Sequence, residues 1–170
     1  LAVAVGLTML LDKKIERTKD RVLAKQKISN QEALILFSLL IIFCFILLLM
    51  LNLEILLLAI FSLFLLIMYP LTKRYFNIPQ LILGMAFGSS IPMVFILEKG
   101  VIDTNCILLY LLTILWAVTY DTYYAMADKV DDKKVGIKSS AIFFGKNDIL
   151  YSLYLHYSVV FLFLVIGFFN

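Results

Sequence analysis

The lysine and arginine residues of this chain gather in four short stretches, and long apolar runs lie between these stretches. Hydrophobic residues make up 63% of the 170 residues and charged residues 16%, whereas an average soluble domain is about 45–50% apolar and about 25% charged. A helix needs about 20 apolar residues to cross the roughly 30 Å hydrocarbon core of a bilayer. The pattern therefore predicts an all-α, multi-spanning transmembrane helical bundle and excludes an ordinary soluble domain.

Five apolar runs are long enough to be complete spans, and a partial run precedes them at the beginning of the chain. We expect residues 1–170 to form a single transmembrane domain, which their number allows. The 2 cysteines lie inside apolar runs, which excludes a disulfide framework. The expected spans are residues 1–11 (partial), 33–51, 55–71, 79–97, 105–127 and 149–169.

The distribution of charge orients these spans. If successive spans alternate in direction, Lys99 is the only basic residue on one side of the membrane. The other side collects the basic stretches within 12–30, 72–78 and 128–148. The positive-inside rule predicts that the basic side is cytoplasmic.

The first and last residues of the sequence suggest whether it is a whole protein or a fragment. The chain begins inside an apolar run without an initiator Met and ends directly after the last expected span. These ends favour a fragment or shortened version of a larger membrane protein. The alternative is a small complete membrane protein.

Three aspartates lie at and just after the end of the fourth complete span, at spacings that place them on one helical face. They are Asp121, Asp128 and Asp132, at steps of seven and four residues. A carboxylate at membrane depth is costly and by default indicates function. Like charges four residues apart repel unless a cation lies between them, so metal binding is one reading of this face. The alternative is a solvated helix end in which Lys129, Lys133 and Lys134 are the partners.

A second acidic face begins at the end of the N-terminal apolar run, where Thr8, Asp12, Glu16 and Asp20 follow one another at four-residue steps. The two faces, both on the predicted cytoplasmic side, can converge across a cavity. Such hard oxygen ligands suit Mg²⁺ together with substrate phosphates. Basic side chains nearby are candidates to bind the phosphate oxygens, although basic loops inside the cell also explain them. These candidates are Arg17, Arg21, Lys73 and Arg74.

Several stretches together resemble the UbiA superfamily of intramembrane prenyltransferases. Tyr120-Asp-Thr-Tyr-Tyr-Ala-Met-Ala-Asp, with Asp131-Asp-Lys-Lys-Val-Gly-Ile-Lys-Ser-Ser, is similar to the second aspartate-rich motif of the 4-hydroxybenzoate polyprenyltransferase branch. Tyr69-Pro-Leu-Thr-Lys-Arg-Tyr, Ile78-Pro-Gln-Leu-Ile-Leu-Gly and Ala86-Phe-Gly resemble the middle of the family, and Arg17-Thr-Lys-Asp-Arg resembles the segment after the first motif. The resemblance covers almost the whole chain.

The resemblance implies a helical bundle around a cavity that opens toward lipid. It implies a Mg²⁺-dependent transfer of a polyprenyl group from its diphosphate to the carbon ortho to the hydroxyl of 4-hydroxybenzoate, a step of ubiquinone synthesis. The membrane would be the bacterial or mitochondrial inner membrane, with the active face toward the cytoplasm or matrix, and no nucleic acid partner is expected. The implied catalytic residues are Asp121, Asp128, Asp132 and Arg74; the implied diphosphate ligands are Lys73, Arg74, Arg17 and Arg21; the implied metal ligands are Asp12, Glu16, Asp128 and Asp132.

The first motif departs from the family pattern Asn-Asp-x-x-Asp-x-x-x-Asp. Thr8 and Met9 stand at the first two positions, whereas Asp12 and Glu16 keep the later charges. A methionine thioether does not replace a carboxylate as a ligand of Mg²⁺. An inactive, truncated remnant of such an enzyme is therefore the first alternative. A transporter that uses intramembrane acids is a weaker one, because these acids lie at span ends. His156, away from both acidic faces, is expected to be a packed or hydrogen-bonded core histidine.

Overall fold

The structure, a computed structural model, describes residues 13–14 and 18–169 and is built from helices. No strand occurs within these residues, which confirms the predicted all-α fold. The helices are α2 (Asn30–Leu48), α3 (Leu53–Tyr75), α4 (Gln80–Gly88), α5 (Ser90–Lys99), α6 (Thr104–Val135), α7 (Ser140–Phe144) and α8 (Asp148–Phe169), with a 3₁₀ turn at Gly145–Asn147 before α8.

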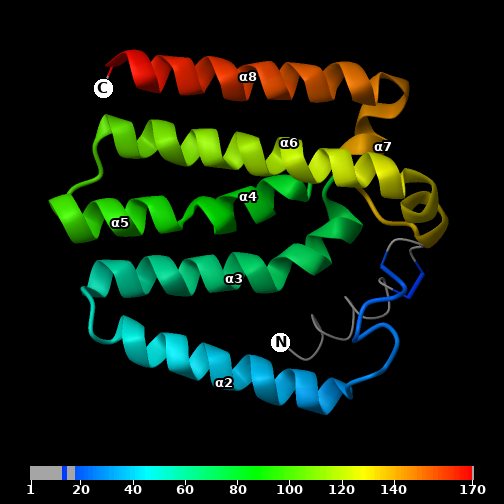
Figure 1. Cartoon of the computed structure of the whole chain (residues 1–170), viewed down its shortest axis with the longest axis horizontal. Coiled ribbons are helices and arrows are strands. Elements are labelled where there is room, and N and C mark those ends of the chain that lie inside the picture. Colours follow the sequence, from blue (N-terminus) through cyan, green and yellow to red (C-terminus); the bar gives the residue numbers. More distant parts are fainter. Residues whose placement is uncertain (1–12, 15–17, 170) are drawn as a thin grey trace.

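Within the described part of the chain, five helical segments are long and apolar enough to cross a membrane. Each overlaps one of the complete spans expected from the sequence, whereas the partial span at 1–11 lies outside the described residues. Figure 1 shows the long helices in a row, with successive helices running in opposite directions and α2 along one edge. The segments are Asn30–Leu48, Leu53–Tyr75, Gln80–Lys99, Thr104–Val135 and Ser140–Phe168.

Helix α6 is the centre of the bundle, because it packs against α4, α5, α7 and α8. The side chain of Asp103 begins it by accepting a 2.9 Å hydrogen bond from the N–H of Cys106. Gly136 ends it in the left-handed conformation, with φ of 73°. Its 32 residues extend over about 48 Å at 1.5 Å per residue, which exceeds the hydrocarbon core and carries the C-terminal turns beyond it.

Two glycines bring α4 unusually close to α6. A Cβ atom on Gly84 would lie 3.0 Å from the carbonyl oxygen of Ile114, and one on Gly88 would lie 3.0 Å from the ring of Tyr110. Small residues four apart allow this close backbone approach in membrane helices. The α4–α6 contact therefore fixes the positions of these two helices relative to each other at the polar end of the bundle.

Prolines interrupt two of the long segments. Pro70 lies inside α3, and Figure 1 shows the last turns of α3 bent away from the rest of the helix. The segment 80–99 breaks at Ser89, because Pro92 has no N–H to donate to the carbonyl of Gly88. Near the break, the hydroxyls of Ser62 and Ser89 donate to the carbonyl of Ala86, at 3.0 and 2.7 Å. These bonds satisfy the backbone where the helix is broken.

The last helix corrects one expectation. His156 is exposed on α8 rather than packed in a core. Among the described elements, α8 has one long neighbour, α6, against which it packs. Most of its surface therefore faces outward, and His156 lies on that surface.

Candidate functional site

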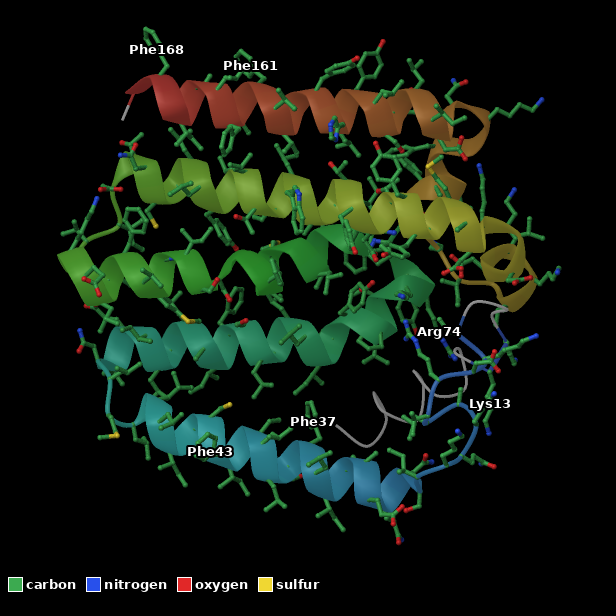
Figure 2. All side chains as sticks on the ribbon, in the orientation of Figure 1. Lys13, Phe37, Phe43, Arg74, Phe161 and Phe168 are labelled. Carbon is green, nitrogen blue, oxygen red and sulfur yellow. The ribbon has the colours of Figure 1, made fainter. Side chains whose placement is uncertain are left out.

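A cavity of about 390 Å³ lies where α3 ends, α4 begins and α6 extends past the apolar part of the bundle. In Figure 2, nitrogen and oxygen atoms gather at this end, near the labelled Arg74 and Lys13, whereas the labelled phenylalanines lie along the apolar helices. The cavity therefore lies at the boundary between the polar end of the bundle and its apolar, membrane-spanning helices. It is lined by Thr18, Arg21, Tyr69, Pro70, Lys73, Pro79, Gln80, Leu83, Asp121, Tyr124, Ala125, Asp128, Asp132, Ile137, Lys138 and Ser139.

All three aspartates predicted on α6 line this cavity. Asp128 and Asp132, one turn apart, are buried, with 9% and 6% of their surface exposed. Asp121 lies two turns earlier and is half-buried. Within the described part of the chain, no three acidic, histidine or cysteine side chains are close enough to hold one metal ion. The wall therefore offers a pair of adjacent carboxylates and a third carboxylate nearer to the membrane.

Tyr69 connects α3 to the acidic wall. Its hydroxyl donates a 3.2 Å hydrogen bond to Oδ2 of Asp121. The Nζ atom of Lys73 lies 4.9 Å from the centroid of the Tyr69 ring, a cation–π contact. One tyrosine thus touches both a basic and an acidic group of the cavity.

The link between α6 and α7 closes another wall, and Lys138 fastens it to α3. The N–H of Lys138 donates to the carbonyl of Lys73 at 2.8 Å, and its Nζ donates to the carbonyl of Tyr75 at 3.0 Å. Behind this wall, Gln80 accepts a 3.3 Å bond from the N–H of Ser140. The link is therefore held by bonds to both α3 and α4.

The structure separates the predicted basic residues into two groups. Lys73 and Arg21 line the cavity, whereas Arg74 is exposed at the end of α3 and does not line it. The roles predicted for Arg74 therefore stay predictions. Arg17 and the first motif, with Thr8, Met9, Asp12 and Glu16, lie outside the described residues.

Two of the three lysines proposed as partners of a solvated helix end, Lys129 and Lys134, contact groups other than the three aspartates. Lys129 donates to Asp148 and to the carbonyl of Gly145, which ties α6 to the beginning of α8. Lys134 pairs with Asp131 at 3.0 Å. These contacts give Lys129 and Lys134 structural roles away from the cavity wall.

Sequence reasoning assigned no role to three residues that shape the cavity: Tyr69, Gln80 and Lys138. Each lies in one of the stretches that carried the family resemblance, and that resemblance was the signal that could have singled them out. Their partners lie 52 or more positions away in the sequence. Spacing along one helix therefore could not indicate these contacts.

The model of the UbiA prenyltransferase family matches residues 10–170, which include every described wall of the cavity. The chain belongs to the UbiA prenyltransferase family. The five long apolar segments among its described residues make this UbiA-family chain an integral membrane protein.

Curated relatives are named 4-hydroxybenzoate octaprenyltransferase. The protein of Enterobacter sp. (strain 638) is 46% identical over 156 residues, covering 92% of this chain and 54% of the relative. That of Citrobacter koseri is 45% identical over 159 residues, covering 94% and 55%, and that of Shewanella halifaxensis 47% over 138 residues, covering 81% and 48%. This UbiA-family chain thus spans about half the length of the curated relatives it matches. No solved structure matches it significantly.

Proposed function

We propose that this chain carries the diphosphate site of an aromatic prenyltransferase. The reaction moves a polyprenyl group from its diphosphate to the carbon ortho to the hydroxyl of 4-hydroxybenzoate, in ubiquinone biosynthesis at an inner membrane. The observation that carries the proposal is the cavity in which Asp128 and Asp132 lie together with Lys73 and Arg21. Buried carboxylates beside cations suit a metal-bound, anionic head group at the end of an apolar bundle. The names of the curated relatives supply the acceptor, 4-hydroxybenzoate, and the transferred octaprenyl group.

The donor set fits Mg²⁺. This ion keeps several water ligands and prefers one or two carboxylates plus substrate phosphates to a cage made entirely of protein ligands. Asp128 and Asp132 are two hard oxygen donors on one wall, and we assign Asp12 and Glu16 as a second pair. When bound there, Mg²⁺ would neutralise negative charge on the diphosphate.

The remaining residues of the cavity bind and shield the donor. Lys73 and Arg21 bind phosphate oxygens, and the guanidinium of Arg21 presents a planar pair of donors. These cations stabilise the diphosphate as the bond from its oxygen to the allylic carbon breaks. The electron-rich phenol ring then attacks the allylic cation, and the ring carbon loses its proton. The apolar side chains of Leu83, Ala125 and Ile137 in the walls exclude water that would capture the cation.

The test measures, by isothermal titration calorimetry, the binding of a non-reactive polyprenyl thiolodiphosphate with and without Mg²⁺. Asp128→Ala should abolish the Mg²⁺-dependent binding because it removes one of two adjacent carboxylates. Asp131→Ala is the matched control, because Asp131 pairs with Lys134 and does not line the cavity. Unchanged binding in Asp128→Ala would contradict the proposal and favour a helix end with a purely structural role.

A further inference from the structure

Two buried polar side chains of the cavity carry hydrogen-bond donors that no described residue uses. Gln80 at the beginning of α4 and Ser139 just before α7 both line the cavity, with 2% and 3% of their surface exposed. Buried polar groups in native proteins nearly always have a partner. The unused donors of these two side chains therefore indicate a ligand.

The orientation of the Gln80 amide follows from its one hydrogen bond. Its Oε1 atom accepts from the N–H of Ser140 at 3.3 Å, and a backbone N–H needs an acceptor. The NH₂ group therefore points away from Ser140. Its nitrogen, Nε2, has no hydrogen-bond partner among the described residues, and none of their polar side-chain atoms is sealed off without a partner. Nε2 therefore opens onto the cavity that Gln80 lines.

Ser139 is adjacent to this amide and offers a second donor. Its Oγ atom accepts a 3.4 Å hydrogen bond from the N–H of Ile142 at the beginning of α7. Its hydroxyl donates to no group in the described part of the chain. Since the next residue, Ser140, bonds Gln80, the two side chains are neighbours on the cavity wall. We call Gln80 and Ser139 the neutral corner, because both are polar and uncharged.

The neutral corner lies deeper in the bundle than the pair of adjacent carboxylates. Ser140, whose N–H bonds Gln80, shares a 2.7 Å hydrogen bond between hydroxyls with Thr122 of α6. Asp128 and Asp132 follow Thr122 by six and ten residues, which is about 9 and 15 Å along the helix. The corner is therefore displaced from these carboxylates toward the apolar part of α6.

The carboxylate at the same depth, Asp121, is turned to another side of α6. Neighbouring residues differ by about 100° around a helix axis. Asp121 accepts its hydrogen bond from Tyr69 of α3, whereas Thr122 bonds Ser140 of α7. At this depth, one side of α6 presents a carboxylate and the other side adjoins neutral donors.

We propose that the neutral corner binds the carboxylate of the aromatic acceptor, 4-hydroxybenzoate. The proposal deepens the function proposed above and rests on it. The diphosphate already has Lys73, Arg21 and the metal pair, and the corner lies too far from Asp128 to serve the same group. An amide N–H and a hydroxyl form strong hydrogen bonds to a carboxylate, and they add no cation that would compete for the diphosphate.

The shape of the acceptor fits this placement. Its carboxylate lies across the ring from the hydroxyl, and the new bond forms beside the hydroxyl. Donors that hold the carboxylate therefore leave the reacting side of the ring free to face the donor substrate. A site built to hydrogen-bond one group of a substrate also rejects analogues that lack the group. The neutral corner would thus determine specificity for the acceptor.

Gln80→Glu tests the proposal, because it reverses the hydrogen-bonding character of the corner. Glutamate still accepts from the N–H of Ser140 but presents a carboxylate in place of the NH₂ group. Binding of 4-hydroxybenzoate, measured by ligand-observed NMR in detergent with Mg²⁺ and pyrophosphate, should weaken at least tenfold, because repulsion replaces a hydrogen bond to a charged group. Binding of 4-hydroxybenzamide, whose NH₂ group donates to the new carboxylate, should strengthen.

Two further variants separate this effect from charge and from folding. Gln31→Glu is the matched control, because Gln31 is exposed in the first turn of α2 and does not line the cavity. It should bind 4-hydroxybenzoate as wild type does. Gln80→Leu removes the donor without adding a charge. It should lose affinity for 4-hydroxybenzoate, bind phenol like wild type, and keep its Mg²⁺-dependent binding of pyrophosphate, which also shows that it is folded.

Three results would overturn the inference. If pyrophosphate binds but Gln80→Glu and Gln80→Leu bind 4-hydroxybenzoate as wild type does, the corner does not hold the carboxylate, although the proposed function stands. If Gln80→Leu weakens binding of pyrophosphate and not of 4-hydroxybenzoate, Gln80 serves the diphosphate instead. If wild type binds neither pyrophosphate nor 4-hydroxybenzoate, the proposed function fails and this inference fails with it.

Discussion

The hydroxyl of Tyr69 donates a 3.2 Å hydrogen bond to Oδ2 of Asp121, a residue 52 positions later in the sequence. The bond joins α3 to α6 inside the cavity, while Lys73 lies over the ring of the same tyrosine. A carboxylate close to membrane depth is costly without a partner. Tyr69 supplies that partner and fixes where Asp121 lies relative to the basic end of α3.

Tyr69→Phe should therefore destabilise the folded chain. Removing the hydroxyl leaves the half-buried carboxylate of Asp121 without this donor, and one intramolecular hydrogen bond contributes about 1 kcal/mol. Chemical denaturation in detergent measures the change. Tyr75→Phe is the control, because Tyr75 is exposed at the end of α3 and its backbone carbonyl, not its hydroxyl, accepts from Lys138. Equal stability of the two variants would mean that the Tyr69–Asp121 bond contributes nothing.

Gly84→Val should destabilise the bundle by about 1–3 kcal/mol through overpacking. A Cβ atom at Gly84 would meet the backbone of Ile114, with its oxygen at 3.0 Å and its Cα at 3.2 Å, and backbone atoms cannot turn aside. A Cβ atom at Gly167 of α8 would meet no atom within 4 Å, so Gly167→Val is the control. Thermal unfolding should separate the two variants, and a similar melting temperature for both would show that α4 and α6 can move apart freely.

Gln26→Gly should stabilise the chain. Among the described residues, Gln26 is the only non-glycine residue with positive φ, at 55°, and the left-handed conformation costs an L-residue about 1–2 kcal/mol. The N–H of Lys27 donates to the carbonyl of Val22, and that of Gln26 donates to Leu23, the pattern in which glycine is preferred. Lys27→Gly should bring no gain. Denaturation midpoints compare the two, and a loss of stability in Gln26→Gly would contradict the expectation.

Asp103→Asn should change how stability depends on pH. The hydrogen bond from Lys99, 2.9 Å from the carboxylate, and the bond from the N–H of Cys106 hold the pKa of Asp103 below its usual range. A depressed pKa stabilises the folded state above the unfolded pKa, and this stability is lost as the pH falls through the folded pKa. Wild type should therefore be more stable than the variant near neutral pH, and the two should converge in acid. A difference in melting temperature that is independent of pH would argue against a role for the charge.

Labelling of single cysteines tests the orientation of the bundle. Asn77→Cys, between α3 and α4, and Val101→Cys, between α5 and α6, are exposed positions at opposite ends of the segment 80–99. In a background that carries Cys44→Ala and Cys106→Ala, we expect an impermeant maleimide to label Val101→Cys, but not Asn77→Cys, from outside intact cells. The reverse result would place the cavity on the outer side of the membrane.

The sequence alone was sufficient for the helical segments, because an apolar run of spanning length is a local property. Several boundaries differ by a few residues, and the largest differences have a physical reason. α3 continues to Tyr75 and α6 to Val135, beyond the expected ends at 71 and 127, because polar residues extend a helix past the apolar core. Pro92 is visible in the sequence, but the apolar run alone predicts one continuous span at 79–97, whereas the structure breaks it at Ser89.

The acidic wall was also predictable, because the spacing within α6 already placed Asp121, Asp128 and Asp132 on one face. The tertiary structure decided which residues of other helices meet that face. Neighbours such as Lys73 and Arg74 differ by about 100° around the helix axis, so only the packing of α3 determined that Lys73 lines the cavity. The pairing of Tyr69 with Asp121 likewise depends on two helices that pack together in space, which no local pattern of residues specifies.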